Sequence, residues 1–453
     1  MKLILSLAFP LIISQLINMT LVLTDVWMMS RLSVEAIAAG GLGAAVYNFV
    51  IMIAASIVGC VANLIAIAFG KRATQPELGD REVREAVKGG VLMAIVLSAV
   101  SLGLFAIAPQ LLIKAQQPAE VVDLAMVYLD ALKWTAIPGL MLLVFRGLTS
   151  AFGSVRSIMV MSLATIVLNV PISYVLAFTF GMGLSGLGLG SALAAAIVML
   201  SYGIWVFSQP LFAPFSPWLN LHEYRIKLLW PLAALGLPIG LASLLEHVLI
   251  YGGTLMAGTI SITALALHQI LLQCLGFTWN INFGLSQAAA ILVGRDFGAG
   301  NIAGIKRTAI RAFGLVSGLS LALAAVFIGW PESIVALFNL AQEGEAVTRL
   351  FYSVLLVVAL SFIVDAWQLL AINLLRGMKI VMAPTVITGI GYWLCGLPAA
   401  WWLMGIYGLG GIWAGIGIGL AITGVLLLVL LLKAIREQEH PRVVEVLSDS
   451  PVC

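Results

Sequence analysis

Long uninterrupted apolar segments constrain this chain more than any other feature of its sequence. Twelve of them reach the length of about 18 residues that a membrane-spanning helix needs. They lie near residues 3–28, 38–69, 89–113, 122–148, 158–180, 187–208, 228–257, 262–293, 311–338, 349–375, 381–404 and 408–433. Strands of a membrane barrel alternate in polarity over about ten residues, and these segments do not alternate. The sequence therefore predicts an all-α polytopic membrane protein with twelve transmembrane helices.

The composition excludes a soluble protein of this length. Of the 453 residues, 62% are hydrophobic and 9% are charged, whereas soluble domains are about 45–50% apolar and about 25% charged. The first apolar segment continues from Leu3 to about Leu23 with no cleavage site after it, so we interpret it as a spanning helix and not as a removable signal. A net charge of +3 gives no indication of a nucleic-acid partner, and the lipid bilayer is the expected surrounding.

The basic residues predict the orientation of the chain. Twelve spans place both termini on one side of the membrane. If that side is the cytoplasm, 19 of the 23 Lys and Arg residues fall on the inner segments, as the positive-inside rule requires. We therefore predict a multi-pass protein whose termini are both cytoplasmic. The longest polar connection, 71–88, predicts a short cytoplasmic helix of its own.

An internal repeat divides the spans into two sets of six. Five pairs of residues recur at an offset of 224 to 228: Pro10 and Pro238, Gly70 and Gly294, Gly153 and Gly377, Pro171 and Pro398, Gly183 and Gly408. An offset of six spans gives both sets the same orientation in the membrane. We predict two pseudo-symmetric lobes, 1–208 and 228–435, joined by a cytoplasmic linker at 209–227 and followed by a cytoplasmic tail at 436–453. Pairs of glycines four residues apart (186 and 190, 236 and 240, 411 and 415) predict close helix packing.

Three acidic residues fall well inside the predicted spans: Asp25, Glu246 and Asp365. A carboxylate at the centre of a membrane helix costs about 2.5–3.5 kcal/mol, and such residues usually face the bundle interior and mark an ion or substrate path. No basic residue is expected at mid-span in the C-terminal lobe to neutralise Glu246 and Asp365, so we assign cation binding to this pair. Asp25 lies near the outer end of its helix, and a proton or coupling site and a structural hydrogen bond both stay open for it.

Other polar and aromatic residues within the spans are candidates for the lining of a cavity between the lobes, although each also fits a helix-to-helix contact. They are Gln15, Asn18, Asn169, Gln269, Asn280, Asn282, Phe283 and Trp367. The sequence contains no phosphate-binding loop, zinc-protease motif or nucleophile elbow. We therefore expect no catalytic residues, no cofactor and no metal site beyond a possible Na⁺ at the acidic pair, with energy taken from an ion gradient.

Several short motifs resemble the multidrug and toxic compound extrusion (MATE) family over nearly the whole chain. They are LAFP at 7–10, DVWMM at 25–29, GLP at 236–238 followed by LE at 245–246, GLSQA at 284–288, LRG at 375–377, and GYW at 391–393 with GLP at 396–398. The resemblance implies a V-shaped fold that exports cationic amphipathic drugs and dyes by alternating access, driven by inward Na⁺ or H⁺ flow. It also implies a monomer in the bacterial inner membrane. The alternative is a flippase for lipid-linked precursors from the wider superfamily, but flippases tend to carry extra spans and a basic cavity.

Within that family the chain is similar to the NorM branch. Glu246 and Asp365 stand at the positions of that branch's cation-binding acids, and Asp25 matches its first-helix aspartate. The DinF branch instead pairs the first-helix aspartate with a second aspartate, four residues after an asparagine on the fifth helix. Here Asn169 is present but Ser173 occupies the later position. The resemblance therefore implies a NorM-like cation site in the second lobe.

Overall fold

The computed structural model describes residues 1–338 and 340–439, and all regular structure within them is helical. Twelve helices of this part are long and apolar enough to cross a membrane. The prediction of an all-α, twelve-span protein is confirmed. The uninterrupted helices are α1 (Lys2–Leu32), α2 (Val34–Lys71), α3 (Pro76–Lys114), α7 (Gly183–Ser208), α8 (Leu229–Ile260), α9 (Ile262–Gly298), α10 (Ile302–Gly329), α12 (Glu345–Gly377) and α15 (Leu409–Glu439).

Three spans change helix type in their interior, and the seventh begins with the 3₁₀ turn η5 (Ile226–Leu228). The fourth span consists of α4 (Ala119–Leu132), the 3₁₀ turn η1 (Lys133–Thr135) and α5 (Ala136–Ala151). The fifth span is α6 (Val155–Tyr174) followed by the π-helical η2 (Val175–Thr179), and the eleventh is α13 (Met382–Gly389), the π-helical η7 (Ile390–Gly396) and α14 (Leu397–Tyr407). A short α11 (Pro331–Leu337) and the 3₁₀ turn η6 (Leu340–Glu343) connect α10 to α12. The fifth and eleventh spans are equivalent in the repeat, so π-helix occurs in the same span of each half.

Two predicted boundaries were wrong. Residues 76–88 are not a separate helix but the first turns of α3, because Pro76 begins the helix and nothing interrupts it before the span. Ion pairs with the end of α2 hold these turns, with 2.7 Å from Lys71 Nζ to Glu82 Oε1 and 2.7 Å from Arg72 Nε to Asp80 Oδ1. The ninth span ends at Gly329 and not near 338, because Pro331 lacks the N–H that would continue the helix and starts α11 instead.

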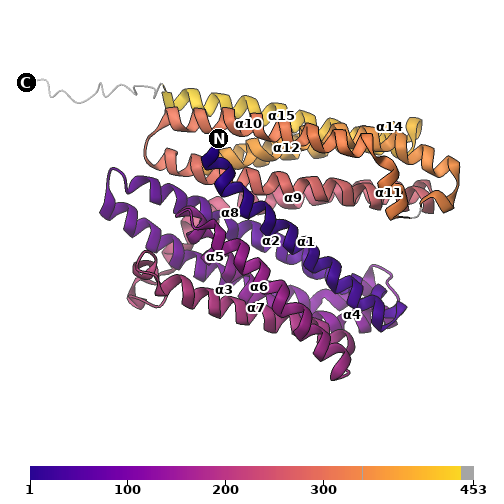
Figure 1. Cartoon of the computed structure of the whole chain (residues 1–453), viewed down its shortest axis with the longest axis horizontal. Coiled ribbons are helices and arrows are strands. Elements are labelled where there is room, and N and C mark those ends of the chain that lie inside the picture. The colour runs from indigo at the N-terminus through magenta and orange to yellow at the C-terminus, as the bar shows by residue number, and fades with distance from the viewer. Residues whose placement is uncertain (339, 440–453) are drawn as a thin grey trace, which may run out of the picture.

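The two halves share one core at one end of the molecule. We call this the terminal end, because α1 begins and α15 ends there. Its core joins Ile4, Val61 and Leu148 to Leu285 and Leu427. Away from it the cores are separate: one cluster contains only residues between 249 and 420, and another only residues between 28 and 187. The halves are thus joined at the terminal end and diverge from it as a V, with α1 crossing between them (Figure 1).

Glycines allow the halves to touch at the terminal end. A methyl group added to Gly298 of α9 would overlap the backbone carbonyl oxygen of Ile67 in α2, and one added to Gly70 of α2 would overlap that of Arg295 in α9. Only a residue without Cβ permits such an approach. The helices α2 and α9 therefore cross with their backbones in contact.

The predicted glycine pairs are packing sites. Gly186 and Gly190 of α7 lie against residues 173–177, and Gly411 and Gly415 of α15 lie against residues 400–404, the equivalent contact in the other half. The pair on α8 at 236 and 240 packs on Ile57 of α2 and so joins the two halves. The close-packing interpretation of all three pairs is confirmed.

The connection between the halves packs on the N-terminal half. It contains three 3₁₀ turns, η3 (Ala213–Phe215), η4 (Leu221–Glu223) and η5 (Ile226–Leu228). Lys88 of α3, which is 1% exposed, donates to the carbonyl oxygen of Asn220 at 3.0 Å and to Oε2 of Glu223 at 2.6 Å. Of the predicted tail at 436–453, residues 436–439 belong to α15, and the remainder lies outside the described residues.

Candidate functional site

Two of the three intramembrane acids lie together inside the C-terminal half. Asp365 of α12 is 3% exposed, and its carboxylate interacts electrostatically with Glu246 of α8, which is half-buried. Tyr392 of η7 is fully buried and interacts electrostatically with both acids. Three spans that are distant in sequence therefore meet at one polar cluster, which we call the acidic cluster (Glu246, Asp365, Gln368, Tyr392).

Oδ2 of Asp365 is buried without a hydrogen-bond partner within the described part of the chain. The side chains of Gln368 and Tyr392 interact with each other, and Oε1 of Gln368 and the Tyr392 hydroxyl have no other partner there. Gln368 lies one turn after Asp365 and is 3% exposed, so both side chains lie on the same face of α12. An unpaired polar group in such a place costs free energy. These oxygens are the donor type that hard cations such as Na⁺ prefer.

A basic residue from the end of a span, not from mid-span where none was expected, interacts with one of these acids. Arg376, in the last turn of α12, interacts electrostatically with Glu246 and with Tyr392. No ion pair closer than 4.0 Å joins Arg376 to Glu246 in the described residues, so the contact is at longer range. The sequence placed Arg376 at the cytoplasmic boundary, and a long guanidinium side chain can extend from there along the helix toward the bundle interior. Asp365 has no corresponding interaction with Arg376.

Asp25 lies apart from this cluster, in the N-terminal half. It is near the C-terminal end of α1, away from the terminal end of the molecule, and is half-buried, and its Oδ1 atom is buried without a hydrogen-bond partner in the described residues. Its carboxylate interacts electrostatically with Tyr128 of α4. Asn169 of α6 is not part of this site: its Nδ2 donates to Ser191 Oγ at 2.9 Å, between α6 and α7.

The remaining candidate residues do not form one group. Asn282 is fully buried and shares hydrogen bonds of 3.3 and 3.4 Å with Ser320 of α10, and Nδ2 of Asn280 donates to the Gly276 carbonyl of its own helix at 2.8 Å. Within the part of the chain that the structure describes, three others show no hydrogen bond from their side chains: Gln15, which is half-buried, and Asn18 and Gln269, which are exposed.

The aromatic candidates lie on different helices. Phe283 stacks on Trp279 of the same helix α9, with ring centroids 4.7 Å apart and planes 9° from parallel. Trp367 is 42% exposed and donates its indole N–H to Ser317 of α10 at 2.7 Å. The structure thus provides one stacked aromatic face on α9 and fixes the other ring against α10.

Arginines also join the two halves at the terminal end, a role that the sequence analysis did not assign. Nε of Arg295 donates to the Ala151 carbonyl at 2.8 Å, and its guanidinium lies 4.7 Å from the centre of the Phe69 ring. Arg146 of α5 donates to Oε1 of Gln287 at 3.4 Å. The only sequence signal for these contacts is that both arginines fall at the boundary of an apolar span.

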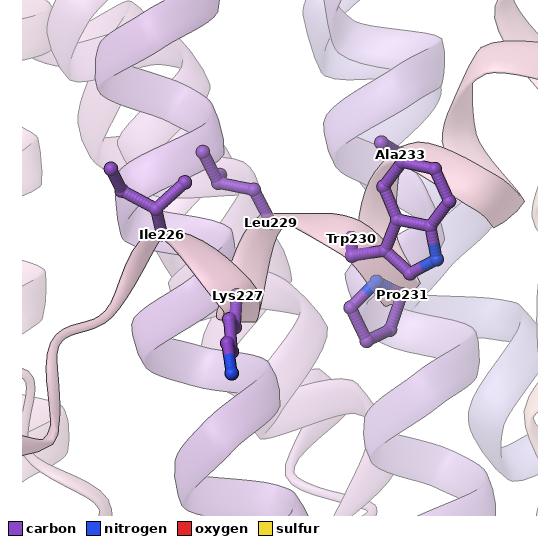
Figure 2. Close-up of a pocket in the computed structure, with 6 residues that line it drawn as sticks. All are labelled: Ile226, Lys227, Leu229, Trp230, Pro231 and Ala233. Carbon is purple, nitrogen blue, oxygen red and sulfur yellow. The ribbon is translucent and has the colours of Figure 1, made fainter.

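Two surface pockets of the described part lie away from the acids. The larger, with a volume of about 520 Å³, is lined by Ile226, Lys227, Leu229, Trp230, Pro231 and Ala233 at the start of α8 (Figure 2). The other is lined by residues 6–10 and 153–156 at the terminal end. Among residues 1–338 and 340–439, no group of three or more His, Cys, Asp or Glu side chains is placed to hold a metal ion.

Comparison with known proteins assigns the family. The model of the family MatE matches residues 10–175 and residues 238–402 of this chain. The chain belongs to the MATE family. The two matched segments begin 228 residues apart, an offset that the sequence repeat also shows. MATE proteins are transporters, so this chain is a membrane transporter and not an enzyme.

MATE relatives match over nearly the whole length. The chain is 34% identical over 437 residues to a probable multidrug resistance protein NorM of Pseudomonas putida, covering 94% of this chain and 93% of the relative. It is 33% identical to the protein of the same name from Pseudomonas aeruginosa, covering 94% of this chain and 88% of that one. The NorM-like resemblance is thereby confirmed.

Solved MATE structures share the fold. A variant of the Vibrio cholerae MATE transporter VcmN superposes with a TM-score of 0.87 at 20% identity, covering 96% of this chain and 97% of that one. A multidrug resistance MATE family transporter in an outward-facing conformation superposes with a TM-score of 0.87 at 18% identity, covering 97% of this chain and 96% of that one. The V-shaped MATE fold predicted from the sequence is confirmed.

Proposed function

We propose that this MATE transporter is a cation-coupled antiporter that exports cationic amphipathic compounds by alternating access. The observation that carries the proposal is the acidic cluster. It holds two carboxylates that interact electrostatically and a buried carboxylate oxygen, Oδ2 of Asp365, that has no hydrogen-bond partner in the described residues, inside a membrane protein with no ATP-binding motif. The names of the NorM relatives support drugs as substrates.

The coupling ion is proposed to bind at Glu246 and Asp365. Na⁺ would fit the oxygen donors of Asp365, Gln368 and Tyr392, and H⁺ would compete for the same carboxylates. Arg376 lies near Glu246 but has no interaction with Asp365, so we assign Asp365 as the principal ligand and Glu246 as the partner that Arg376 tunes. A bound cation neutralises the pair, which favours a different packing of the C-terminal half than the empty pair does.

The proposed orientation follows from charge. The terminal end carries most basic residues, so we place it in the cytoplasm of a bacterial inner membrane, with both termini inside. The shared core then closes the cytoplasmic side, and the separate cores leave the outer side open between the halves. We propose that drug binds between the halves there, that the protein works as a monomer, and that no cofactor takes part.

The test is transport by purified protein in liposomes. Efflux of a fluorescent organic cation is measured with a Na⁺ gradient alone and with a pH gradient alone, for wild type, Glu246→Gln and Asp365→Asn. Either acid variant should abolish gradient-driven transport, while the exposed control Glu345→Gln, which is 79% exposed at its side chain, should transport as wild type does. Full transport by both acid variants would refute the site. Wild-type transport that responds to neither gradient would refute the coupled mechanism.

A further inference from the structure

The groove at the start of α8 has features that the transport mechanism does not use. It is lined by Ile226, Lys227, Leu229, Trp230, Pro231 and Ala233, and we call it the α8 groove. In Figure 2 the Trp230 and Pro231 rings lie side by side, Ile226 and Leu229 lie opposite them, and the Lys227 chain extends from between them. Its walls are apolar, and Lys227 supplies the one charged group.

The apolar walls of the α8 groove are strongly exposed. Ile226 is 86% exposed and Trp230 is 78% exposed. The span of α8 begins at Ile226, so these side chains lie where the hydrocarbon of the membrane meets the headgroups. Tryptophan at a membrane surface prefers this level, because its ring is apolar and its N–H is polar. At that level of the membrane, lipid would cover the walls of the groove.

Two cations at the groove have no acidic partner. Lys227 and the neighbouring Arg225 are exposed and make no ion pair or hydrogen bond from their side chains within the described residues. The nearest acid in sequence, Glu223, is already bound to Lys88. Free cations beside an apolar groove complement a molecule that carries an anion at one end and hydrocarbon beyond it.

The spacing fits a phospholipid. Lys227 lies in the 3₁₀ turn η5 that leads directly into α8. It precedes Pro231 and Ala233 by about one to two turns, or roughly 7–10 Å along the axis. In a phospholipid the phosphate lies at a similar distance above the first carbons of the acyl chains. We propose that the α8 groove binds an anionic phospholipid of the leaflet at the terminal end, with its phosphate at Lys227 and Arg225 and one acyl chain along Trp230 and Pro231.

A lipid at this place would lie at the joint between the halves. A methyl group added to Gly89 of α3 would lie 2.8 Å from the Leu228 carbonyl oxygen and 2.5 Å from a Leu232 methyl group. The first turn of α8 thus packs on the N-terminal half, and η5 connects it to the linker. A bound lipid would hold this joint in the packing seen here.

The experiment is a titration of the full chain in detergent with phosphatidylglycerol or with phosphatidylcholine of the same acyl chains, followed by native mass spectrometry. Wild type should retain phosphatidylglycerol preferentially. The Arg225→Gln/Lys227→Gln variant should lose that preference by about fivefold for each charge removed, with phosphatidylcholine unaffected. Trp230→Ala should weaken both lipids.

Matched controls keep the result specific. Arg307→Gln/Arg311→Gln removes the same charge from exposed positions on α10 at the same end, and it should retain the wild-type preference. Equal losses in both double variants, or none in the groove variant, would overturn the proposal. Full displacement of phosphatidylglycerol by inorganic phosphate would also overturn it, because the site would then bind a free anion. Elution and melting temperature of each variant, matched to wild type, show that the variants are folded.

Discussion

The first helix of each half follows the same pattern from its proline, Pro10 in α1 and Pro238 in α8, yet the two helices carry their acids at different depths. Glu246 stands eight residues after Pro238, where the N-terminal half has Asn18. Asp25 stands fifteen residues after Pro10, where the C-terminal half has Gly253. The two halves therefore share their helices and glycine contacts, but their acidic residues stand at different positions of the repeat.

The surroundings of the acids differ as well. Glu246 has a histidine, His247, an arginine, Arg376, and a second carboxylate within electrostatic range. Asp25 has Tyr128 and no second acid in the interactions of the described residues. Two acids that interact must lose and gain charge as a pair, whereas a single acid acts alone. This difference makes the C-terminal half the expected place of ion coupling.

The difference between the halves predicts that Asp25 contributes less to coupled transport than Glu246 and Asp365 do. We expect Asp365→Asn to lower gradient-driven efflux at least about tenfold and Asp25→Asn to lower it less than about fivefold, within the usual range of coupling energies. Initial rates of dye efflux from liposomes, normalised to protein content, measure both. A larger loss from Asp25→Asn than from Asp365→Asn would place coupling in the N-terminal half.

The next largest effect is expected on stability, from a substitution in the shared core at the terminal end. In Gly298→Ala the new methyl group would overlap the Ile67 carbonyl oxygen, so we expect a loss of about 1–3 kcal/mol in unfolding free energy, as in overpacked cores. A lower melting temperature of the purified protein measures it. Gly314→Ala on α10 is the matched control, because nothing lies within 4 Å of its added methyl group, and alanine favours the helix. An unchanged melting temperature in Gly298→Ala would contradict the close crossing of α2 and α9.

The fold was predictable because each of its main features leaves a pattern that can be read directly from the sequence. Apolar length gives the spans, and the spacing of Pro10 and Pro238 gives the repeat. The start of α3 was misjudged because charged residues at 77–88 are typical of a separate surface helix. In the structure these charges pair with Lys71 and Arg72 at the end of α2, which lets one helix extend beyond the membrane.

The candidate site was predictable only in part. Buried acids are costly in a membrane, so Glu246 and Asp365 are visible in the sequence. The reach of Arg376 is not, because it depends on which way a side chain at the helix end extends. Nor does the sequence separate an asparagine in a cavity from one bonded between helices. In the sequence, Asn169 and Asn282 cannot be distinguished from asparagines that line a cavity and bind a ligand. In the structure, each is hydrogen-bonded to a serine.

These two asparagines sharpen the comparison between the halves, because each joins two helices of one half. Asn282→Ala removes the partner of Ser320, and Asn169→Ala removes that of Ser191. We expect each change to cost about 0.5–1.5 kcal/mol of stability, as for hydrogen bonds between membrane helices, with little change in the range of compounds transported. Melting temperature and the inhibition profile of dye efflux measure the two effects. Asn18→Ala, at an exposed position without a side-chain hydrogen bond in the described residues, is the control for the melting temperature alone, because Asn18 is itself a candidate for the cavity lining. An altered range of compounds with an unchanged melting temperature would make the asparagine a drug ligand.

The smallest expected effect concerns the linker, which packs on the N-terminal half through Lys88 and Glu223. The hydrogen bond from Lys88 and its charge lower the pKa of Glu223 below its usual 4.5. A lowered pKa stabilises the ionised form in the folded protein, so the contact is complete above about pH 4.5 and is lost as the pH falls through the lower value.

A spin label at position 219, in a chain whose native cysteines are replaced by alanine, should gain mobility between pH 5 and pH 3. Glu223→Gln should make that mobility independent of pH in this range, since the titrating carboxylate is gone. A wild-type label that stays equally immobile at both pH values would show that contacts other than Glu223, such as those of the Phe212 and Phe215 rings with the Phe152 ring, hold the linker on the N-terminal half. The two halves would then still differ in their acids, but the charge of Glu223 would make no difference to how the linker packs.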